Sequence, residues 1–336
     1  MKNLLYVGNK LSSHGFSVTT IETLGPLLEK EGFQVFYAST KKNKFFRMTE
    51  MLWKVLKLRK KIDCVLIDTY STSNFWYAFL VSQWAKALKI KYIPILHGGN
   101  LPRRLQTNLK ACEMIFSNAY KNVTPSNYLL EAFLKAGFKN LEYIPNSIEI
   151  QNYPFKSRSE IVPKLLWVRA FAEIYNPIMA IEVYRELKFE YPEAVLCMVG
   201  SDKDGALEKA KLYAEKYNLD VTFTGHLSKP DWIALSSKYS IFLNTSRFDN
   251  APVSVIEAMA LGLAIVSTDV GGIPYLIEHK KDALLVENEN VHSMAVAVRE
   301  AGKNTEESKN RIASARQKAA SFDWEIVKKS WKEILN

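Results

Sequence analysis

The sequence predicts an α/β protein with two doubly wound, Rossmann-like domains in series. Short apolar runs alternate with amphipathic helical stretches, which is typical of parallel sheets covered by helices on both faces. The alternation pauses once, in the polar segment 151–163 with its two prolines, and then restarts. The 336 residues, 48% of them hydrophobic, suffice for two cores. We expect an N-terminal domain at 1–155, a C-terminal domain at 156–320, and a separate C-terminal helix at 321–336.

The first half contains apolar runs that are too short for buried helices and are bounded by Gly, Asn or Asp, as strands are. The first run stops at Gly8 and turns polar, which indicates a strand and not a signal peptide. Strands are predicted at 3–8, 33–39, 63–69 and 91–98, with further short apolar segments at 112–117 and 122–126 and the end of the half at 141–150. Helices are predicted at 20–32, 41–61, 75–89 and 127–137.

The second half repeats the pattern. Strands are predicted at 164–171, 194–201, 220–226, 240–246, 264–269 and 283–288, and helices at 177–189, 205–217, 230–238 and 249–262. The tail 322–336 is amphipathic, with Trp324, Val327, Trp331 and Ile334 along one side. Ligands of doubly wound sheets bind beyond the carboxyl ends of the strands, so we expect the site in a cleft between the two domains.

The net charge of +10 is concentrated in residues 41–61, which hold nine Lys or Arg and one Glu. The apolar residues of this segment follow helical spacing. A basic amphipathic helix of this kind can lie on an anionic membrane, or it can pack on a sheet and solvate its lysines. Nucleic-acid binding is a third alternative, but no nucleic-acid-binding module accompanies the patch. No stretch reaches the ~18 apolar residues of a membrane span.

The three cysteines, Cys64, Cys112 and Cys197, show no metal-ligand spacing. Two of them lie in apolar, strand-like runs. We therefore expect buried, reduced thiols in a cytosolic protein.

The stretch DNAPVSVIEAMALG, residues 249–262, predicts an apolar helix that carries a carboxylate in its interior and has another just before its start. Asn250 can cap the helix, with Pro252 in its first turn and Gly262 at its end. The interior is nearly all apolar, so Glu257 must be largely buried, at a cost unless it is paired. The helix N-terminus offers a phosphate site, and ribose hydroxyls can pair with the carboxylate. Ser254 lies on the same polar face as Glu257, for which a structural salt bridge is the alternative.

Three further residues lie near predicted strand ends. Gly15, in the first strand-to-helix loop, permits close approach to a ligand, but it can equally be a turn glycine. His97 can bind a hydroxyl or phosphate, or it can be structural. Arg169 suits a phosphate, with an ion pair to Glu173 as the alternative. The paired glycines of STDVGGIP, residues 267–274, can line the same cleft.

The stretch SRFDNAPVSVIEAMALGLAIVSTDVGGIPYLI, residues 246–277, closely resembles the signature of the retaining glycosyltransferases of family 4, a group 1 glycosyltransferase family with the GT-B fold. Their pattern is E-x(7)-E, a helix ending in A-M-A-x-G, a strand and a G-G loop. YIPNSIE at 143–149 and FTGHLSKPDWIALSSKYSIFLNTS at 223–246 also match. The helix at 321–336 resembles the one that in this family crosses back to brace the first domain. In the first domain itself the resemblance is limited to the layout, Gly15 and His97.

The resemblance implies a role for each matching residue. Glu257 would hold the donor ribose, and Asp249, at the first Glu position, would contact the transferred sugar. Arg169 would neutralise the diphosphate leaving group, which Gly15 would approach from the other domain. His97 would lie near the acceptor or the sugar hydroxyls. The start of the helix would surround the donor's sugar and diphosphate with Asn250, Ala251, Pro252, Val253 and Ser254.

The chain departs from the family at two positions. Asp249 is one methylene shorter than the usual Glu, a difference that can track the sugar. Where the family has a lysine, this chain has Tyr175 followed by Asn176, so a phosphate contact is missing or is supplied elsewhere, with Lys203 and Lys229 as candidates.

The resemblance implies a hexosyltransferase-type enzyme that moves a sugar from a nucleotide-sugar donor, preferably UDP-linked, with retention and without a metal or other cofactor. The acceptor would be a glycan or a lipid-linked molecule in cell-surface polysaccharide synthesis. We expect a cytoplasmic enzyme, peripheral on the inner face of the membrane through residues 41–61, with no nucleic-acid partner. The alternatives are a GT-B epimerase or phosphorylase and a non-catalytic nucleotide-sugar-binding module.

Overall fold

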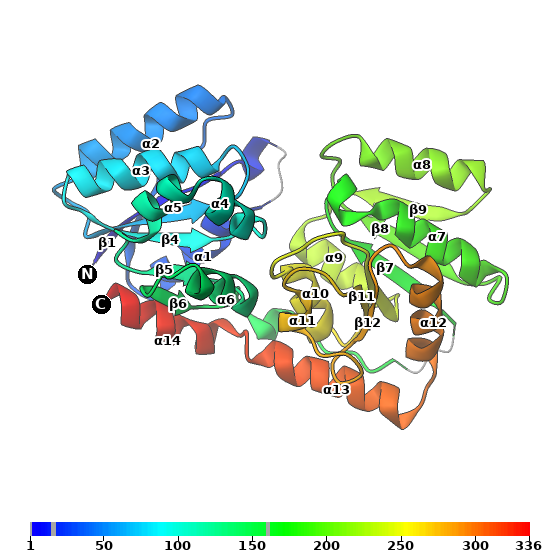
Figure 1. Ribbon diagram of the computed structural model, residues 1–336. Coiled ribbons are helices and arrows are strands. Elements are labelled where there is room, and N and C mark those ends of the chain that lie inside the picture. The colour runs from blue at the N-terminus through cyan, green and yellow to red at the C-terminus, as the bar shows by residue number, and fades with distance from the viewer. Residues whose placement is uncertain (1, 15–17, 159–161) are drawn as a thin grey trace. The chain divides into compact units, whose positions relative to one another are not determined.

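The computed structural model describes residues 2–14, 18–158 and 162–336, which form two compact units (Figure 1). Unit 1 comprises Met1–Pro145 and Val327–Asn336, and unit 2 comprises Asn146–Ile326. The division therefore falls earlier than the expected boundary at residue 155. Residues 146–155 belong to unit 2 because they bond to it: the Asn146 side-chain amide donates to the carbonyl of Ala251 at 3.0 Å.

Unit 1 contains one six-stranded parallel sheet in the order β2-β1-β3-β4-β5-β6. The strands are β1 (Asn3–Val7), β2 (Gln34–Ala38), β3 (Cys64–Thr69), β4 (Lys91–Leu96), β5 (Asn122–Thr124) and β6 (Leu141–Tyr143). The helices are α1 (Thr20–Lys30), α2 (Lys44–Leu58), α3 (Phe75–Ala87), α4 (Leu101–Thr107), α5 (Leu109–Phe116) and α6 (Asn127–Lys135), and α14 (Trp324–Leu335) contributes its residues from Val327 onward. Short 3-10 turns occur at Ser12–His14 in this unit and at Ile150–Asn152 and Glu173–Tyr175 in unit 2.

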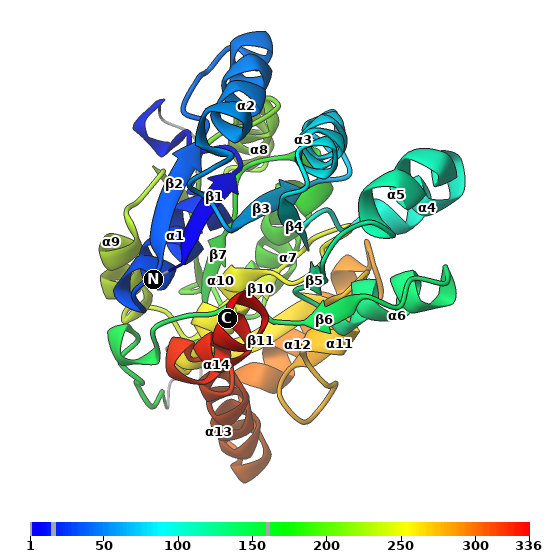
Figure 2. The same ribbon diagram turned by 90° about the vertical axis from the view of Figure 1, so that its left-hand side faces the viewer.

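The strand order determines which helices share a face of the sheet. The chain moves from β1 to the edge strand β2 through α1, then reverses direction and crosses to β3, β4, β5 and β6 in turn. Right-handed crossovers therefore place α1 on one face and α2, α3, α5 and α6 on the other. Figure 2 shows α3, α5 and α6 on the side of the sheet opposite α1. Every residue of the central strand β3 is buried.

The C-terminal helix α14 packs with its predicted apolar side inward, since Trp324, Val327, Trp331 and Ile334 are all buried. Glu31, which caps the end of α1, pairs with Lys328 at 3.0 Å and also with Lys332. These two ion pairs fix the end of the chain on unit 1.

Unit 2 contains a second six-stranded parallel sheet in the order β12-β11-β10-β7-β8-β9. Its strands are β7 (Lys164–Val168), β8 (Val195–Val199), β9 (Val221–Gly225), β10 (Ile241–Asn244), β11 (Ala264–Thr268) and β12 (Leu284–Val286). Its helices are α7 (Pro177–Lys188), α8 (Ala206–Lys216), α9 (Lys229–Ser236), α10 (Val253–Ala260), α11 (Ile273–Leu276), α12 (Val291–Gly302) and α13 (Glu306–Ala320), and it also contains the first residues of α14. The prediction of two doubly wound, Rossmann-like domains is confirmed.

Some elements differ from the prediction. The apolar segment 112–117 is the end of helix α5, and in this part of the chain the strand β5 comprises only Asn122–Thr124. Helices α4, α11, α12 and α13 were not expected. Among the residues that the structure describes, no helix combines the length and apolarity needed to cross a membrane.

Candidate active site

Helix α10 begins at Val253, and its N-cap is Pro252, not Asn250 as the sequence suggested. Proline has no side chain that can cap, so no side chain of the N-cap residue satisfies the first-turn amides. The Asn250 amide hydrogen instead bonds to the carboxylate of Asp249 at 2.9 Å. Uncapped amides at a helix N-terminus attract anions, and the helix dipole adds to this attraction.

The other end of α10 follows the prediction. Gly262 has φ +75° and donates its amide hydrogen to the carbonyl of Met259, and Leu263 donates to that of Ala258. This pair of bonds is a Schellman motif, in which glycine meets the need for a left-handed residue. Helix α10 thus ends one turn after Glu257. Because the helix is short and buried and has a defined start and end, the position of Glu257 is fixed.

Glu257 is buried and has two partners on one carboxylate oxygen. The Tyr153 hydroxyl donates to Oε1 at 2.7 Å, and Lys229 Nζ lies 2.5 Å from the same oxygen. Burial and the neighbouring carboxylate raise the pKa of Tyr153 well above its ordinary value, so the phenol stays protonated and remains a donor. The Lys229 contact is the structural salt bridge that the sequence left open, although half of the Lys229 side chain remains exposed.

Two buried polar atoms near this carboxylate have no hydrogen-bond partner among the described residues. One is the hydroxyl oxygen of Ser254, one turn before Glu257, and the other is Nε of Arg169. Buried polar groups are nearly always bonded, so two that lack partners in one place indicate a ligand or water that satisfies them.

Arg169 follows strand β7 and pairs with Asp249, not with Glu173, which pairs with Lys209 at 2.6 Å. Its guanidinium lies over the ring of Tyr175, 4.4 Å from the ring centroid. Burial lowers the pKa of the guanidinium from its ordinary value, and the neighbouring Tyr175 and Glu257 side chains oppose that shift. Arginine remains charged under such conditions, so this cation is held in place between a carboxylate and a ring.

Asn176, at the other departure from the family pattern, has a structural role. It has φ +45°, and its side chain caps α7 by accepting from the amide of Met179 at 3.4 Å. Pro177 at the first helical position completes this start signal.

Three glycines allow the backbone around the site to pack closely. A Cβ on Gly200 would lie 1.8 Å from the carbonyl oxygen of Arg169, and one on Gly272 would lie 1.9 Å from that of Asn250. A Cβ on Gly271 would lie 2.3 Å from the carbonyl oxygen of Asp249. The G-G loop therefore supports the segment before α10 by backbone contact.

In unit 1, His97 follows strand β4 and is paired with a buried carboxylate. Its Nε2 lies 2.9 Å from Oδ1 of Asp68 on β3, and the hydroxyl of Tyr6 donates to the same oxygen at 3.0 Å. The other oxygen, Oδ2, is buried and has no partner in the described part of the chain. A Cβ on Gly8 would lie 2.5 Å from that oxygen. The ends of three neighbouring strands are thus built around the Asp68–His97 pair.

The structure gathers some predicted site residues and not others. Unit 2 brings together Arg169, Asp249 and the start of α10 from Asn250 to Glu257. His97 belongs to unit 1, and Gly15 lies outside the described residues. The sequence did not identify the partners Tyr153, Asp68 and Gly200, which contact the site from positions distant in the chain.

The family model for glycosyl transferases group 1 matches residues 149–318 of the 336. The chain belongs to the group 1 glycosyltransferases. The matched region contains the whole unit 2 cluster from Tyr153 to Glu257, and His97 lies outside it.

This group 1 glycosyltransferase is 26% identical to an uncharacterised glycosyltransferase of Haemophilus influenzae, over 98% of this chain and 94% of that protein. It is 24% identical to AmsK of Erwinia amylovora, an amylovoran biosynthesis glycosyltransferase, over 78% of this chain and 68% of AmsK. Its fold is similar to that of HepE from Anabaena, crystallised in complex with UDP and glucose, with a TM-score of 0.79, 17% identity, and coverage of 100% of this chain and 99% of HepE. The GT-B fold class is thereby confirmed.

Proposed function

We propose that the protein is a retaining glycosyltransferase of the family 4 type that moves a hexosyl group from a UDP-sugar to a glycan or lipid-linked acceptor. One observation carries the donor assignment. Ser254 Oγ and Arg169 Nε are buried and unpartnered within the described residues, around a carboxylate and an uncapped helix N-terminus. A nucleoside diphosphate supplies the missing partners, because its phosphate oxygens accept hydrogen bonds and its ribose hydroxyls donate them.

Each group then has a role in donor binding. Glu257 accepts from the ribose hydroxyls, and Tyr153 and Lys229 hold its carboxylate in position. Arg169 and the amides at the start of α10 bind the diphosphate, and Asp249 contacts the transferred sugar. The complex of HepE with UDP and glucose supports UDP as the nucleotide.

In the chemical step, the bond between the anomeric carbon and the diphosphate oxygen breaks, and its electron pair goes to the diphosphate. The charge that develops there is stabilised by Arg169 and the α10 amides, which are positioned before the reaction. The acceptor oxygen forms its bond to the same face of the sugar, and its proton passes to the departing diphosphate. His97 contacts the acceptor or the sugar hydroxyls from unit 1.

Tyr175 stands at the position where the family pattern has a lysine. Tyr175 provides its ring to the guanidinium of Arg169, and Lys229 is engaged by Glu257. We therefore propose that Arg169 and the helix amides supply the positive charge at the diphosphate, with no metal required. Turnover that fell at least about tenfold on chelation and returned with added Mg²⁺ or Mn²⁺ would contradict this assignment.

Calorimetry tests the donor site. We expect UDP to bind wild type more tightly than GDP does, and expect Glu257→Ala and Arg169→Ala to weaken UDP binding by about tenfold or more each. Arg299→Ala is the matched control, because Arg299 is also part-buried and paired with two carboxylates, Glu186 and Glu190, elsewhere on unit 2. Equal UDP affinity in wild type and Glu257→Ala would exclude Glu257 as the ribose ligand.

A panel of nucleotide sugars, scored by release of nucleoside diphosphate with and without an acceptor extract, tests the reaction. We expect release that depends on the acceptor and a product whose anomeric configuration matches that of the donor. Release without acceptor indicates an epimerase, and binding without release indicates a non-catalytic module.

We further propose that the protein acts in cell-surface polysaccharide synthesis on the cytoplasmic face of a membrane. The relationship to AmsK supports the pathway class. Three buried free cysteines fit a reducing compartment. The nine basic residues of segment 41–61, four of them on α2 and the others next to its two ends, supply attraction to anionic lipid. Charge reversal at Lys57, Arg59, Lys60 and Lys61 is expected to abolish vesicle binding and lower activity on lipid acceptors. Unchanged values would contradict the membrane assignment.

A further inference from the structure

The tryptophans of this chain are unevenly distributed between core and surface. Four of the seven, Trp167, Trp232, Trp324 and Trp331, are at most 5% exposed. The other three are Trp53 on α2 and Trp76 and Trp84 on α3, with 53%, 43% and 40% of their surface exposed. All three exposed tryptophans therefore lie on two helices that follow each other in one layer of unit 1.

The exposed face of α3 is apolar along its length. Trp76, Leu80 and Trp84 recur every four residues and are all exposed. Spacing of four places them on one stripe of the helix. The opposite stripe of α3, which includes Val81 and Ala85, is fully buried in the core. The outer stripe is thus a second apolar face of α3, separate from the face that packs in the core of unit 1.

Helix α2 adds to this face. Phe45, Phe46, Trp53 and Leu56 are exposed, whereas Met51 and Val55 point into the core. The two helices are neighbours, since the hydroxyl of Tyr77 on α3 donates to the carbonyl of Lys44 at the start of α2 at 3.2 Å. Figures 1 and 2 both show α2 beside α3.

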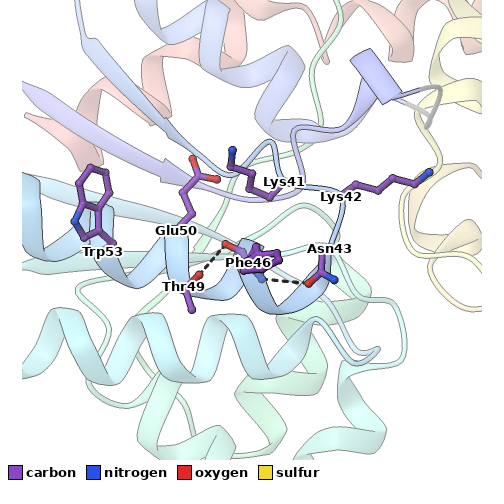
Figure 3. Close-up of a pocket in the computed structure, with 7 residues that line it drawn as sticks. All are labelled: Lys41, Lys42, Asn43, Phe46, Thr49, Glu50 and Trp53. Carbon is purple, nitrogen blue, oxygen red and sulfur yellow. Dashed lines mark hydrogen bonds between the residues drawn. The ribbon is translucent and has the colours of Figure 1, made fainter.

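Basic side chains accompany the aromatic rings. Lys57 Nζ lies 4.4 Å from the ring centroid of Trp53. A hollow of about 640 Å³ on the outer side of α2 is lined by Phe46 and Trp53 together with Lys41 and Lys42 (Figure 3). Glu50 also lines it, but this carboxylate is already paired with Lys54 at 2.8 Å and bonded to Ser39 at 2.6 Å.

We propose that the outer faces of α2 and α3 form one docking surface for a bilayer that contains anionic phospholipid. Trp76, Leu80 and Trp84 enter the boundary between headgroups and acyl chains together with Phe46 and Trp53, and the lysines contact lipid phosphates. Tryptophan beside lysine is the composition of membrane interfaces, whereas protein–protein interfaces are depleted in lysine. The inference rests on the proposed membrane location. It goes further by naming the surface that contacts the bilayer, because the charge of segment 41–61 alone does not identify that surface.

Vesicle sedimentation and fluorescence test the surface. The variants are W76S/W84S, which removes both tryptophans of the α3 stripe without changing any charge, and the matched control F189S on unit 2, whose Phe189 is 87% exposed. Vesicles contain phosphatidylcholine alone or with about one third phosphatidylglycerol. Wild type and F189S are expected to bind the anionic vesicles equally, and W76S/W84S at least about tenfold more weakly. UDP calorimetry on each variant reports the donor site separately, so loss of docking and failure of the proposed function are distinguishable.

A second measurement uses wild-type protein only. Lipids brominated on the acyl chain are expected to quench part of its tryptophan fluorescence in anionic vesicles, because inserted rings come within reach of bromine. The proposal is overturned by W76S/W84S binding as tightly as wild type, or by fluorescence that bromine does not quench. A wild-type dimer that W76S/W84S converts to monomer would also overturn it, since this face would then join two copies of the chain.

Discussion

Asp68 and His97 form a pair across the ends of two adjacent strands, with Oδ1 of the buried carboxylate 2.9 Å from Nε2 of the partly buried ring. An ionised carboxylate only accepts hydrogen bonds, so the proton of this contact resides on Nε2. The ring nitrogen that remains for a substrate is Nδ1. Asp68 therefore acts as a positioning residue for the histidine that we propose contacts the acceptor or the sugar.

The variant Asp68→Asn keeps the shape but removes the charge, and its side-chain amide can donate to Nε2, which a carboxylate cannot do. We expect kcat/KM to fall about 10- to 100-fold, the range found for carboxylates that orient functional histidines at metal sites. The control is Tyr6→Phe, which removes the other hydrogen bond to Oδ1 and leaves the charge. Nitrogen chemical shifts of His97 should show loss of the Nε2–H form in Asp68→Asn alone. Unchanged shifts and activity would reduce the pair to a structural contact.

Much of the fold was predictable because its elements carry local signals. The central strands are short apolar runs, and the end of α10 at Gly262 follows from the backbone requirement of a Schellman motif. Helices α12 and α13 also had start signals that could have been used. Asn290 accepts from the amide of Ser293 at 2.9 Å, and Thr305 from that of Ser308 at 3.3 Å.

The site was predictable only where its chemistry lies in one segment. The helix with Glu257 could be identified as a site because a carboxylate surrounded by apolar residues in the same turn is unusual, and this contrast is visible in the local sequence. Its partner Tyr153 lies more than a hundred positions earlier in the chain, and Asp68 precedes His97 by a complete strand–helix–strand unit. Such partners are determined by strand order and packing, which no local pattern encodes.

Gly200 is predicted to control the position of Arg169. Its φ is +156°, and a Cβ there would collide with the Arg169 carbonyl oxygen. Gly200→Ala should lower the free energy of unfolding by about 3 kcal/mol and weaken UDP binding, because the backbone of Arg169 must move. The control is Gly205→Ala, where φ is +85° and the space around the added Cβ is open. It introduces backbone strain without a clash, and we expect it to lower the free energy of unfolding by about 1 kcal/mol. Similar UDP affinity in both variants would contradict the prediction.

The pH dependence of α14 docking follows from Glu31. Its hydrogen bond to Lys332, followed by that to Lys328, lowers the pKa of the carboxyl below its ordinary value of 4.5. A lowered folded-state pKa means that the stabilisation is complete above about pH 4.5 and is lost as pH falls through the folded-state value. Glu31→Gln should cost about 1 kcal/mol at pH 7 and much less at pH 3, measured by denaturant unfolding of unit 1 signals.

The comparison variant is Glu131→Gln, which removes an exposed pair with Lys135 at 3.7 Å in the same unit. We expect its effect on the free energy of unfolding to be near zero at both pH values. Equal costs for the two variants at pH 7, or a Glu31→Gln cost that does not change with pH, would show that the ion pairs to α14 do not stabilise the fold.

Asp249 is one of the two positions at which this chain departs from the family pattern, and the structure places its carboxylate on the guanidinium of Arg169. In the absence of donor, this contact competes with a diphosphate for the same cation. Asp249→Asn should therefore tighten UDP binding by about fivefold while lowering turnover, because the proposed contact to the transferred sugar is weakened.

Asp249→Glu keeps the charge but places it one methylene further out. It should change relative kcat/KM across a donor panel while UDP affinity stays within about twofold of wild type. The exposed Asp220→Asn serves as the control. An identical donor ranking in Asp249→Glu and wild type would exclude Asp249 as a determinant of sugar preference.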